Sequence, residues 1–398
     1  MKKLNQFNIF LIGYIDLNVH DGATKHFLML REYFINSGLK IKTIVKDYPI
    51  DKKHKNNKDL FKIPIWIPQN IFFLKTFLIL MNFEICLFLF LFLNHLKRKI
   101  HLIYLRESPL NFAVLLMHFL FKIPYIIESN SLIIEDLKEG NKKFACFLEK
   151  YIEKLNFRFA QKIITVTNNM KNYYISLYKL LPQKIDVIPN GFDFNHLKSF
   201  TEIKQETQLR NKKTSTLLYL GKLHKREGIH ILLSALALIK DRYSLLVNIV
   251  GQGKDQEFFK DLSEKLNLGN KIVFTGPKPY SEVGDYISQA DICFAPLVRY
   301  RNEVTGVSPI KVFEYLAYKK PIIASRLPGL EFIEENKIGL LFEPDNPKDL
   351  AEKIEYLIHH YDEAIEMGKK GFEYVKKYHD YNLLHNRIIE MCLKYVSN

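Results

Sequence analysis

The sequence predicts an α/β protein of two domains, each with a parallel sheet that helices cover on both faces. Two observations support this prediction. The chain has 398 residues, which is too long for one ordinary hydrophobic core and suits two domains of about 200 residues each. In both halves, short apolar runs of strand length alternate with helical stretches, and this alternation is typical of a parallel sheet.

The first half opens with an apolar strand and continues with alternating helices and strands. A turn at Asp21-Gly22 follows the first strand, and apolar residues at helical spacing then predict a helix that ends at Ser37-Gly38. The apolar positions of this helix are Phe27, Leu30, Phe34 and Ile35. The predicted strands are Phe7–Ile15, Leu39–Val45, Leu102–Leu105, Tyr125–Ile127 and Lys162–Thr165.

The second half repeats this alternation after a polar segment. Residues 198–213 lack apolar periodicity, which predicts a linker between domains at 1–197 and 214–375. Helices are predicted at Gly228–Lys240 and Pro309–Tyr318. The predicted strands are Thr216–Leu220, Leu245–Val250, Lys271–Phe274, Ile292–Ala295 and Pro321–Ala324. Two such sheets joined by a hinge would leave a central cleft at the carboxyl ends of their strands, where open α/β sheets bind ligands.

Composition and charge narrow the class of protein. Hydrophobic residues at 47% and charged residues at 25% are ordinary for a folded soluble protein. The four cysteines are scattered without metal-binding spacing, which favours reduced thiols and a cytoplasmic location. The net charge of +15 suggests an anionic partner: nucleic acid, acidic membrane or a phosphorylated small molecule. The basic residues are spread along the chain without a nucleic-acid-binding motif, so nucleic acid is not expected, and a lysine-rich solvated surface is the competing interpretation.

One apolar segment does not fit the alternation. Residues 71–93 are nearly all apolar, and Lys97-Arg98-Lys99 follows closely. The longest unbroken apolar run, Ile85–Leu93, has nine residues, well short of the ~20 needed to span a bilayer. Two hypotheses stay open: a helix in the membrane interface with the basic triplet on lipid headgroups, or a buried helix of the first domain.

The stretch from Ser308 to Ala317 is the most informative for chemistry. Serine followed by proline suits the N-cap and first position of a helix, whose N-terminus is an anion-binding site. Lys311 adds a positive charge in the first turn. Glu314 lies one turn deeper, where a carboxylate can accept hydrogen bonds from a ribose diol. A well-capped structural helix with a surface Lys311–Glu314 pair is the competing interpretation.

Six short motifs follow one another along the chain: Pro189–Asp193, Gly221-Lys222-Leu223 with Glu227-Gly228, Gly251-Gln252-Gly253, Phe274-Thr275-Gly276, Ala290–Ile292, and Pro309–Ala317 with Lys320-Pro321. In this order and spacing they resemble the retaining glycosyltransferases of family 4. This resemblance implies the GT-B fold, two Rossmann-like domains whose parallel sheets face a central cleft. The first domain would then be the acceptor side, the second would bind a nucleotide-sugar, and residues 376–398 would form a helix that packs back toward the first domain.

The resemblance also implies roles for residues of the second domain. Glu314 would bind the donor ribose, and the amides around Val307 and Ser308, with Lys311, would hold the diphosphate. Further donor contacts would come from Gly221, Gly251, Gly276, Lys222, Lys225 and Arg226, with Glu314, Lys222 and Arg226 as catalytic candidates.

The sequence departs from the family pattern at two positions of this domain. Glu227 stands where the family usually has a diphosphate-binding lysine, so Lys225 or Arg226 is expected to supply that charge. Gly306 stands where many members carry a second glutamate that contacts the sugar, and Glu303 is out of register with it.

In the first domain, the resemblance makes Gly22 part of a glycine-bearing loop near the donor or acceptor; a simple turn glycine is the alternative. Glu128 is a catalytic candidate where several relatives have histidine. Arg106 and Asn130 are acceptor-side candidates, because they also follow strands at their carboxyl ends. His20, beside Asp21, has no predicted role.

The implied reaction is transfer of a sugar with retention at the anomeric carbon. No Asp-x-Asp pair follows a strand, so neither a metal nor another cofactor is expected, and fixed charges and amides would stabilise the leaving diphosphate. The acceptor would be a saccharide or a lipid-linked molecule in lipopolysaccharide, capsule or exopolysaccharide synthesis, at the inner face of the cytoplasmic membrane. The alternatives are a non-catalytic GT-B partner that binds nucleotide or glycan and, less favoured, a sugar-nucleotide epimerase.

Overall fold

The computed structural model describes residues 6–17, 22–47, 59–64, 75–139, 143–197 and 214–396. The predicted linker at 198–213, residues 71–74 of the apolar segment, His20 and Asp21 lie outside these ranges. The chain forms two compact units. The first unit comprises Met1–Val166, Lys171–Ile188 and His385–Asn398, and the second comprises Thr167–Met170 and Pro189–Leu384.

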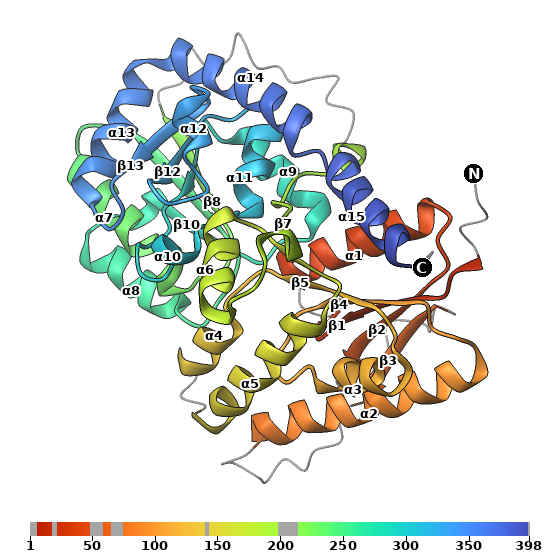
Figure 1. Cartoon of the computed structure of the whole chain (residues 1–398). Helices are drawn as coiled ribbons and strands as arrows, with labels where there is room; N and C mark the ends of the chain where they lie inside the picture. The colour runs from red at the N-terminus through yellow and green to blue at the C-terminus, as the bar shows by residue number, and fades with distance from the viewer. Residues whose placement is uncertain are drawn as a thin grey trace. The chain divides into compact units, whose positions relative to one another are not determined.

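The first unit is built on a seven-stranded sheet in the order β3-β2-β1-β4-β5-β6-β7, and every adjacent pair is parallel. Helices lie on both faces of this sheet (Figure 1). Its elements are β1 (Ile9–Gly13), α1 (Gly22–Asn36), β2 (Ile41–Asp47), β3 (Leu60–Pro64), α2 (Lys75–Lys97), β4 (Leu102–Arg106), α3 (Phe112–Phe121), β5 (Tyr125–Ser129), α4 (Ile133–Glu139), α5 (Lys143–Phe159), β6 (Lys162–Thr165), α6 (Asn168–Tyr178), η2 (Pro182–Lys184) and β7 (Ile185–Val187).

The second unit has a six-stranded sheet in the order β10-β9-β8-β11-β12-β13, again parallel throughout. Its elements are η3 (Phe194–His196), β8 (Ser215–Leu220), η4 (Lys225–Glu227), α7 (Ile229–Ile239), β9 (Leu245–Val250), α8 (Gln256–Lys265), η5 (Gly269–Lys271), β10 (Ile272–Gly276), α9 (Tyr280–Gln289), β11 (Ile292–Ala295), α10 (Asn302–Thr305), α11 (Ile310–Ala317), β12 (Ile322–Ser325), α12 (Phe332–Glu335), β13 (Gly339–Phe342), α13 (Pro347–His359) and α14 (Tyr361–Tyr378). Helix α15 (Tyr381–Val396) begins in this unit, and from His385 onward it belongs to the first.

The two parallel sheets confirm the predicted fold class, and each predicted strand is found within two residues of its expected ends. Strands β3, β7 and β13 were not predicted, because they are three to five residues long and carry no alternation of their own. In α1, Phe27, Leu30 and Phe34 are fully buried, whereas Ile35 is exposed. The prediction that Ile35 belongs to the buried stripe was therefore wrong.

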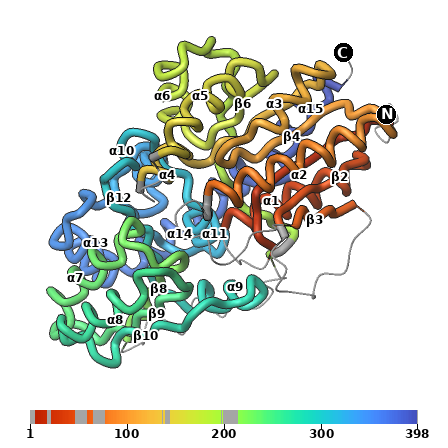
Figure 2. The backbone as a smooth tube through the Cα atoms, turned by 90° about the horizontal axis from the view of Figure 1, so that it is seen from below, coloured from red at the N-terminus to blue at the C-terminus, as the bar shows by residue number. Residues whose placement is uncertain are grey.

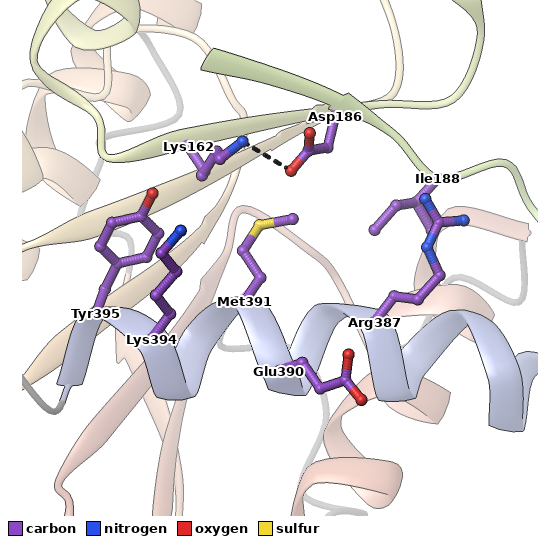
Figure 3. A pocket seen from close by; sticks show the side chains of 8 residues that line it. All are labelled: Lys162, Asp186, Ile188, Arg387, Glu390, Met391, Lys394 and Tyr395. Atoms are coloured by element: carbon purple, nitrogen blue, oxygen red, sulfur yellow. Dashed lines mark ion pairs between the residues drawn. The ribbon is translucent and has the colours of Figure 1, made fainter. Parts of the chain in front are cut away.

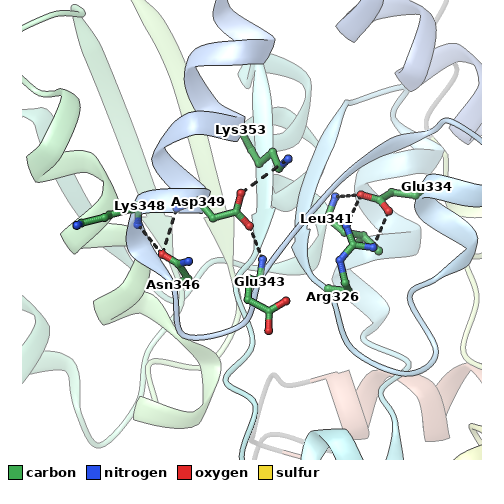
Figure 4. A network of polar contacts seen from close by, with 8 residues as sticks. All are labelled: Arg326, Glu334, Leu341, Glu343, Asn346, Lys348, Asp349 and Lys353. Atoms are coloured by element: carbon green, nitrogen blue, oxygen red, sulfur yellow. Dashed lines mark hydrogen bonds and ion pairs between the residues drawn. The ribbon is translucent and has the colours of Figure 1, made fainter.

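Polar contacts at one end of β12 and β13 hold this edge of the second unit (Figure 4). The Arg326 guanidinium makes two hydrogen bonds to the Glu334 carboxylate, at 2.7 and 2.8 Å, and these lower the pKa of Glu334. Asn346 caps α13 by accepting from the amides of Lys348 and Asp349 at 3.1 and 3.2 Å. These contacts fix the unpredicted strand β13 beside its neighbour.

Helix α2 forms one continuous helix through the apolar segment. Its span Phe77–Lys97 is long and apolar enough to cross a membrane by length and composition, and 28% of it is buried. The length of the unbroken apolar run therefore underestimated the length of the apolar helix, because Asn82 and Glu84 lie within the helix instead of ending it. The buried-helix hypothesis describes only one side of α2, since the other side is exposed, and the membrane-interface hypothesis stays a prediction.

Carboxyl groups lie buried between the helices of the first unit and the ends of its strands. Glu84 Oε2 accepts from the Ala113 amide at 2.8 Å, and Glu149 Oε2 accepts from the Leu110 amide at 2.5 Å, so both bind backbone at the start of α3. Glu153 accepts from the Tyr178 hydroxyl at 2.7 Å. Burial raises the pKa of Glu149 to about 8 and that of Glu153 to about 7.

We expect the contribution of Glu149 to the free energy of unfolding to fall between pH 5 and pH 8. A raised folded-state pKa means that the folded chain holds the proton more tightly, so this stability is complete below the ordinary glutamate pKa of 4.5 and is lost as pH rises toward 8. Each carboxyl can contribute up to about 1.4 kcal/mol per pH unit. Urea unfolding across this range should give a flatter pH dependence for Glu149→Gln than for wild type. Glu352→Gln, at an exposed position, serves as control, and equal slopes for the two variants would contradict the prediction.

Candidate functional site

The predicted residues of the second unit gather where its strand order reverses. Strands β8 and β11 are neighbours, and the sheet continues outward from them in opposite directions. The loop that begins at Gly221 follows β8, and α10 and α11 follow β11. Ligands of open α/β sheets bind at such a switch point, outside the carboxyl ends of the strands.

Helix α11 begins at Ile310, one residue later than predicted, with Pro309 at the N-cap. The prediction that Ser308 caps this helix was wrong. The Ser308 hydroxyl instead accepts from the Asn190 amide at 3.0 Å, and its carbonyl accepts from Asn190 Nδ2 at 2.6 Å. The serine therefore ties α11 to the Pro189–Asp193 motif. The first amides of α11 have no acceptors within the helix and keep the positive end of its dipole.

The amide of Val307, a predicted donor contact, has a partner within the protein. Its N–H donates to the Pro328 carbonyl at 2.8 Å, so it is already used within the protein. The first turn of α11, at Ile310 and Lys311, offers further contacts to an anion, and the contribution of the Ser308 amide stays a prediction.

Lys311 lies against the turn after β8. Its ammonium donates to Glu227 Oε2 at 2.8 Å and to the Tyr219 hydroxyl at 3.2 Å, and it stands 4.4 Å from the centre of the Tyr219 ring. A methyl group at Gly221 would come within 2.7 Å of this ammonium. Both charged side chains are largely buried, with 10% of Lys311 and 18% of Glu227 exposed. Burial would raise the pKa of Glu227, but Lys311 and Arg226 together hold it below its usual range.

At the position where the sequence departs from the family pattern, Glu227 is therefore paired with a cation of another element. Lys311 of α11 places an ammonium 2.8 Å from Glu227, just before Gly228, where the family pattern has a cation. Lys225, one of the two residues predicted to replace it, places its ammonium 4.2 Å from the centre of the Phe258 ring. Lys222 and Arg226 are exposed beside the pair. The competing interpretation of a surface Lys311–Glu314 pair was wrong, because Lys311 reaches Glu227 on another element.

Glu314 is buried one turn into α11, with 6% of its surface exposed. Burial, followed in importance by the negative charge of Glu314, raises the pKa of Tyr318 to about 12. The same two causes raise the pKa of Tyr280. The carboxylate therefore lies near two tyrosines at the base of the helix end that carries Lys311. This order of charges along α11, cation first and carboxylate one turn deeper, is the one predicted from the sequence.

Two glycines of this region have steric reasons to be glycine. A Cβ at Gly251 would collide with the carbonyl oxygen of Gly221, so the ends of β8 and β9 can approach only without side chains there. The Gly251 amide also donates to the Gly276 carbonyl at 3.0 Å, which joins β9 to β10. Gly306 has a φ of +67°, and a Cβ there would lie 2.9 Å from the Pro328 carbonyl oxygen. A glutamate at 306 would be strained, which accounts for the second departure.

In the first unit, the predicted residues Arg106, Glu128 and Asn130 lie together at the ends of β4 and β5. Glu128 is buried and accepts from Asn130 Nδ2 at 2.6 Å and from the Tyr104 hydroxyl at 2.8 Å. Arg106 lies 4.0 Å from the same carboxylate. Gly22 is the exposed first residue of α1.

Sequence reasoning missed His26, which is central to this cluster. His26 Nε2 lies 2.6 Å from Glu128 Oε1. The centre of the His26 ring lies 6.2 Å from the centre of the His385 ring of α15. Burial would raise the pKa of Glu128, but His26, Arg106 and Asn130 hold it well below its usual range. A carboxylate with so many partners is suited to orienting its neighbours, and its predicted catalytic role stays a prediction. The only pointer in the sequence was a histidine inside the apolar face of α1.

Other parts of the described chain add no metal site. Among residues 6–17, 22–47, 59–64, 75–139, 143–197 and 214–396, no group of three or more His, Cys, Asp or Glu side chains could hold a metal ion. A cavity of about 410 Å³ in the first unit is lined by none of the residues predicted to bind donor or acceptor. It lies between β6, β7 and α15, where Lys162 and Asp186 form an ion pair at 3.0 Å (Figure 3).

Comparison with known proteins agrees with this architecture. Residues 20–196 match the family described as Glycosyltransferase Family 4, and residues 200–374 match Glycosyl transferases group 1. An uncharacterized glycosyltransferase of Methanocaldococcus jannaschii is 28% identical over 260 residues, which are 64% of this chain and 64% of that protein. The match thus spans less than two thirds of the relative's length.

Two solved structures share the fold over nearly the whole chain. Sucrose-phosphate synthase from Thermosynechococcus elongatus has a TM-score of 0.79 at 20% identity, covering 98% of this chain and 99% of that one. HepE of Anabaena, in complex with UDP and glucose, has a TM-score of 0.72 at 16% identity, covering 96% and 98%. At these identities the likeness concerns the fold. Because the two family matches follow one another along nearly the whole chain and coincide with its two parallel sheets, the chain belongs to the family 4 glycosyltransferases of GT-B fold.

Proposed function

We propose that this chain transfers a sugar from a nucleotide-diphosphate sugar to an acceptor hydroxyl, with retention of anomeric configuration. The observation that supports this most is the arrangement on α11, where the Lys311 ammonium lies at the turn after β8 and the Glu314 carboxylate is buried one turn deeper. A diphosphate at the helix end would meet Lys311 and the first amides, and a ribose diol would donate to Glu314. The UDP bound in the structure of HepE makes UDP the first donor nucleotide to test.

The proposed reaction needs positive charge where the leaving group develops negative charge. The bond from the anomeric carbon to the diphosphate oxygen breaks, and a bond to the acceptor oxygen forms on the same face of the sugar. The acceptor proton passes to the departing phosphate oxygen. Lys311, held by Glu227 and Tyr219, and the first amides of α11 are fixed before the reaction, so they would stabilise the leaving group without reorganisation, and Lys222 and Arg226 add exposed positive charge. This proposal requires no metal ion.

The acceptor is proposed to be a saccharide or a lipid-linked molecule in surface glycan synthesis, encountered at the cytoplasmic face of a membrane. The long apolar helix α2 and the basic residues after it favour such a place. The alternative, a non-catalytic partner that binds nucleotide or glycan, was suggested by Glu227 and Gly306. Two observations make this alternative less favoured: the charge of Glu227 is paired with Lys311, and a side chain at position 306 would be strained.

A thermal-shift series with UDP, GDP, ADP and CMP tests the donor site. We expect UDP to raise the unfolding temperature by several degrees, because a ligand at 100 times its Kd stabilises the folded state by about 2.7 kcal/mol. The shift should persist with EDTA and should shrink in Lys311→Met. No shift with any of the four nucleotides would argue against a nucleotide-sugar donor.

A further inference from the structure

We infer that the outer face of α2, α3 and α5 docks on an anionic lipid bilayer, with the helices lying flat in its interface. The three helices are neighbours on one side of the first unit (Figures 1 and 2), with α3 in contact with both α2 and α5. Their exposed surface is called the three-helix face below. This inference extends beyond α2 and beyond the proposed reaction, and its test does not depend on transfer.

Helix α2 has an inner and an outer side. Leu80, Phe83, Leu87 and Leu91 are at most 3% exposed and pack into the core. On the opposite side, the residues at helical spacing are 48 to 63% exposed: Ile85, Leu89, Leu93 and Leu96. A soluble helix normally shows polar residues on its outer side. The outer side of α2 is therefore apolar without a partner in the described chain.

The same pattern continues on the two neighbouring helices. In α3, Leu116, Phe119 and Leu120 are 41 to 58% exposed. In α5, the exposed apolar residues follow helical spacing at Phe144, Phe147, Tyr151 and Leu155, with 41 to 59% exposed.

Ring contacts join the three helices into one surface. The ring centres of Phe92 in α2 and Phe121 in α3 are 5.7 Å apart, and those of Phe77 in α2 and Phe144 in α5 are 5.2 Å apart. These exposed apolar side chains thus continue over three neighbouring helices, and contiguous apolar patches of this kind mark interaction sites.

The charges on this face have one sign. The acidic residues of α2 and α5, Glu84, Glu149 and Glu153, are all buried on the inner side. The exposed charged side chains in the described parts of α2, α3 and α5 are all basic, and they are Lys97, Lys150, Lys154 and Arg158. Arg98, Lys99 and Lys122 add exposed cations just after α2 and α3.

The exposed apolar and basic side chains together indicate which kind of partner fits the three-helix face. A second copy of the chain would bring cations against cations, whereas anionic headgroups complement them while the apolar residues enter the acyl boundary.

The face is suited to lying in the interface, although α2 alone is long enough to cross a bilayer. Moving α2 into a spanning position would strip Phe83 and Leu87 from the core. It would also remove Glu84 from the Ala113 amide, to which it is bonded at 2.8 Å. Docking flat keeps these contacts and buries only side chains that are already exposed. If the proposed function holds, the first unit would thus be held beside lipid-linked acceptors.

Vesicle flotation of the full chain tests the inference. We expect binding to vesicles of phosphatidylcholine with phosphatidylglycerol, weakened by salt, and little binding to phosphatidylcholine alone. Leu89→Ser with Leu93→Ser on α2, and separately Phe147→Ser on α5, should each reduce partitioning by about tenfold. Lys150→Gln with Lys154→Gln should weaken binding to anionic vesicles and its salt dependence. The matched control is Leu238→Ser, since Leu238 is 50% exposed on α7 of the second unit.

Unfolding temperatures and circular dichroism of each variant separate docking from folding, because all substituted residues are exposed. No binding of the folded wild-type chain to either vesicle would overturn the inference, as would full binding by the α5 variant. Concentration-dependent dimers that the same substitutions abolish, without vesicle binding, would identify a second copy as the occupant and also overturn it. The UDP thermal shift is measured separately, so a failure of docking leaves the proposed function standing and the reverse also holds.

Discussion

Replacing Lys311 by methionine is expected to lower kcat/KM for sugar transfer by about a thousandfold. Removing one fixed donor to a developing negative charge costs about 10²- to 10³-fold in other enzymes. Here the loss should be at the upper end, because Glu227 would remain largely buried without its partner at 2.8 Å. Its negative charge would then face the leaving diphosphate. Steady-state kinetics with the donor identified by thermal shift would measure the change.

The partner residue allows two causes to be separated. Methionine at 311 should also destabilise the fold, since removing one partner of a buried ion pair leaves an uncompensated charge. Adding Glu227→Gln to Lys311→Met should restore the unfolding temperature but only part of the activity. The exchanged variant, Glu227→Lys with Lys311→Glu, returns the lysine to the position before Gly228 and should recover more activity than either single substitution predicts. Lys311→Met with kcat/KM within threefold of wild type would remove Lys311 from the mechanism.

Replacing Glu314 by glutamine is expected to lower kcat/KM by about 100-fold. A carboxylate accepts two charge-assisted hydrogen bonds from a ribose diol, whereas a glutamine amide offers one neutral acceptor and places an NH₂ group toward the second hydroxyl. Glutamine is a sharper test than alanine, because Glu314 is only 6% exposed and alanine would leave a cavity. The loss should appear mainly in donor binding, measured as a weaker UDP thermal shift and a higher KM for the donor.

The matched control for this substitution is Glu303→Gln. Glu303 is nearby in the sequence, is exposed, and pairs with Arg299 at 2.9 Å, so its replacement should leave transfer within about twofold. Equal losses for the two variants would point to a general effect of charge on this unit. An unchanged kcat/KM for Glu314→Gln would exclude Glu314 as the ribose-binding residue.

Much of the fold could be predicted because its determinants are local. Strands such as Lys162–Thr165, Leu245–Val250 and Ile292–Ala295 are compact apolar runs, and their burial in a parallel sheet follows from that composition alone. The order of cation and carboxylate on α11 is also a property of spacing in one helix. These features needed no knowledge of distant residues.

Features that depend on distant residues could not be predicted in this way. Glu227 and Lys311 are 84 positions apart, and His26 and Glu128 are 102 apart, so no local pattern pairs them. Ser308 was predicted to be a helix cap because its neighbours in sequence suit that role. In the structure its hydroxyl instead accepts a hydrogen bond from the backbone amide of Asn190, 118 positions away. Competition between local and distant partners is resolved only when the chain has packed.

The amino-acid sequence by itself determined two parallel α/β sheets and the placement of charge along the helix after Pro309, since strand burial and helical spacing act over a few residues. Only the tertiary structure decided that Lys311 pairs with Glu227, that a side chain at Gly306 would be strained, and which side of α2 is covered. The physical reason is that ion pairing, backbone collision and burial each depend on groups that the fold brings together from distant parts of the chain.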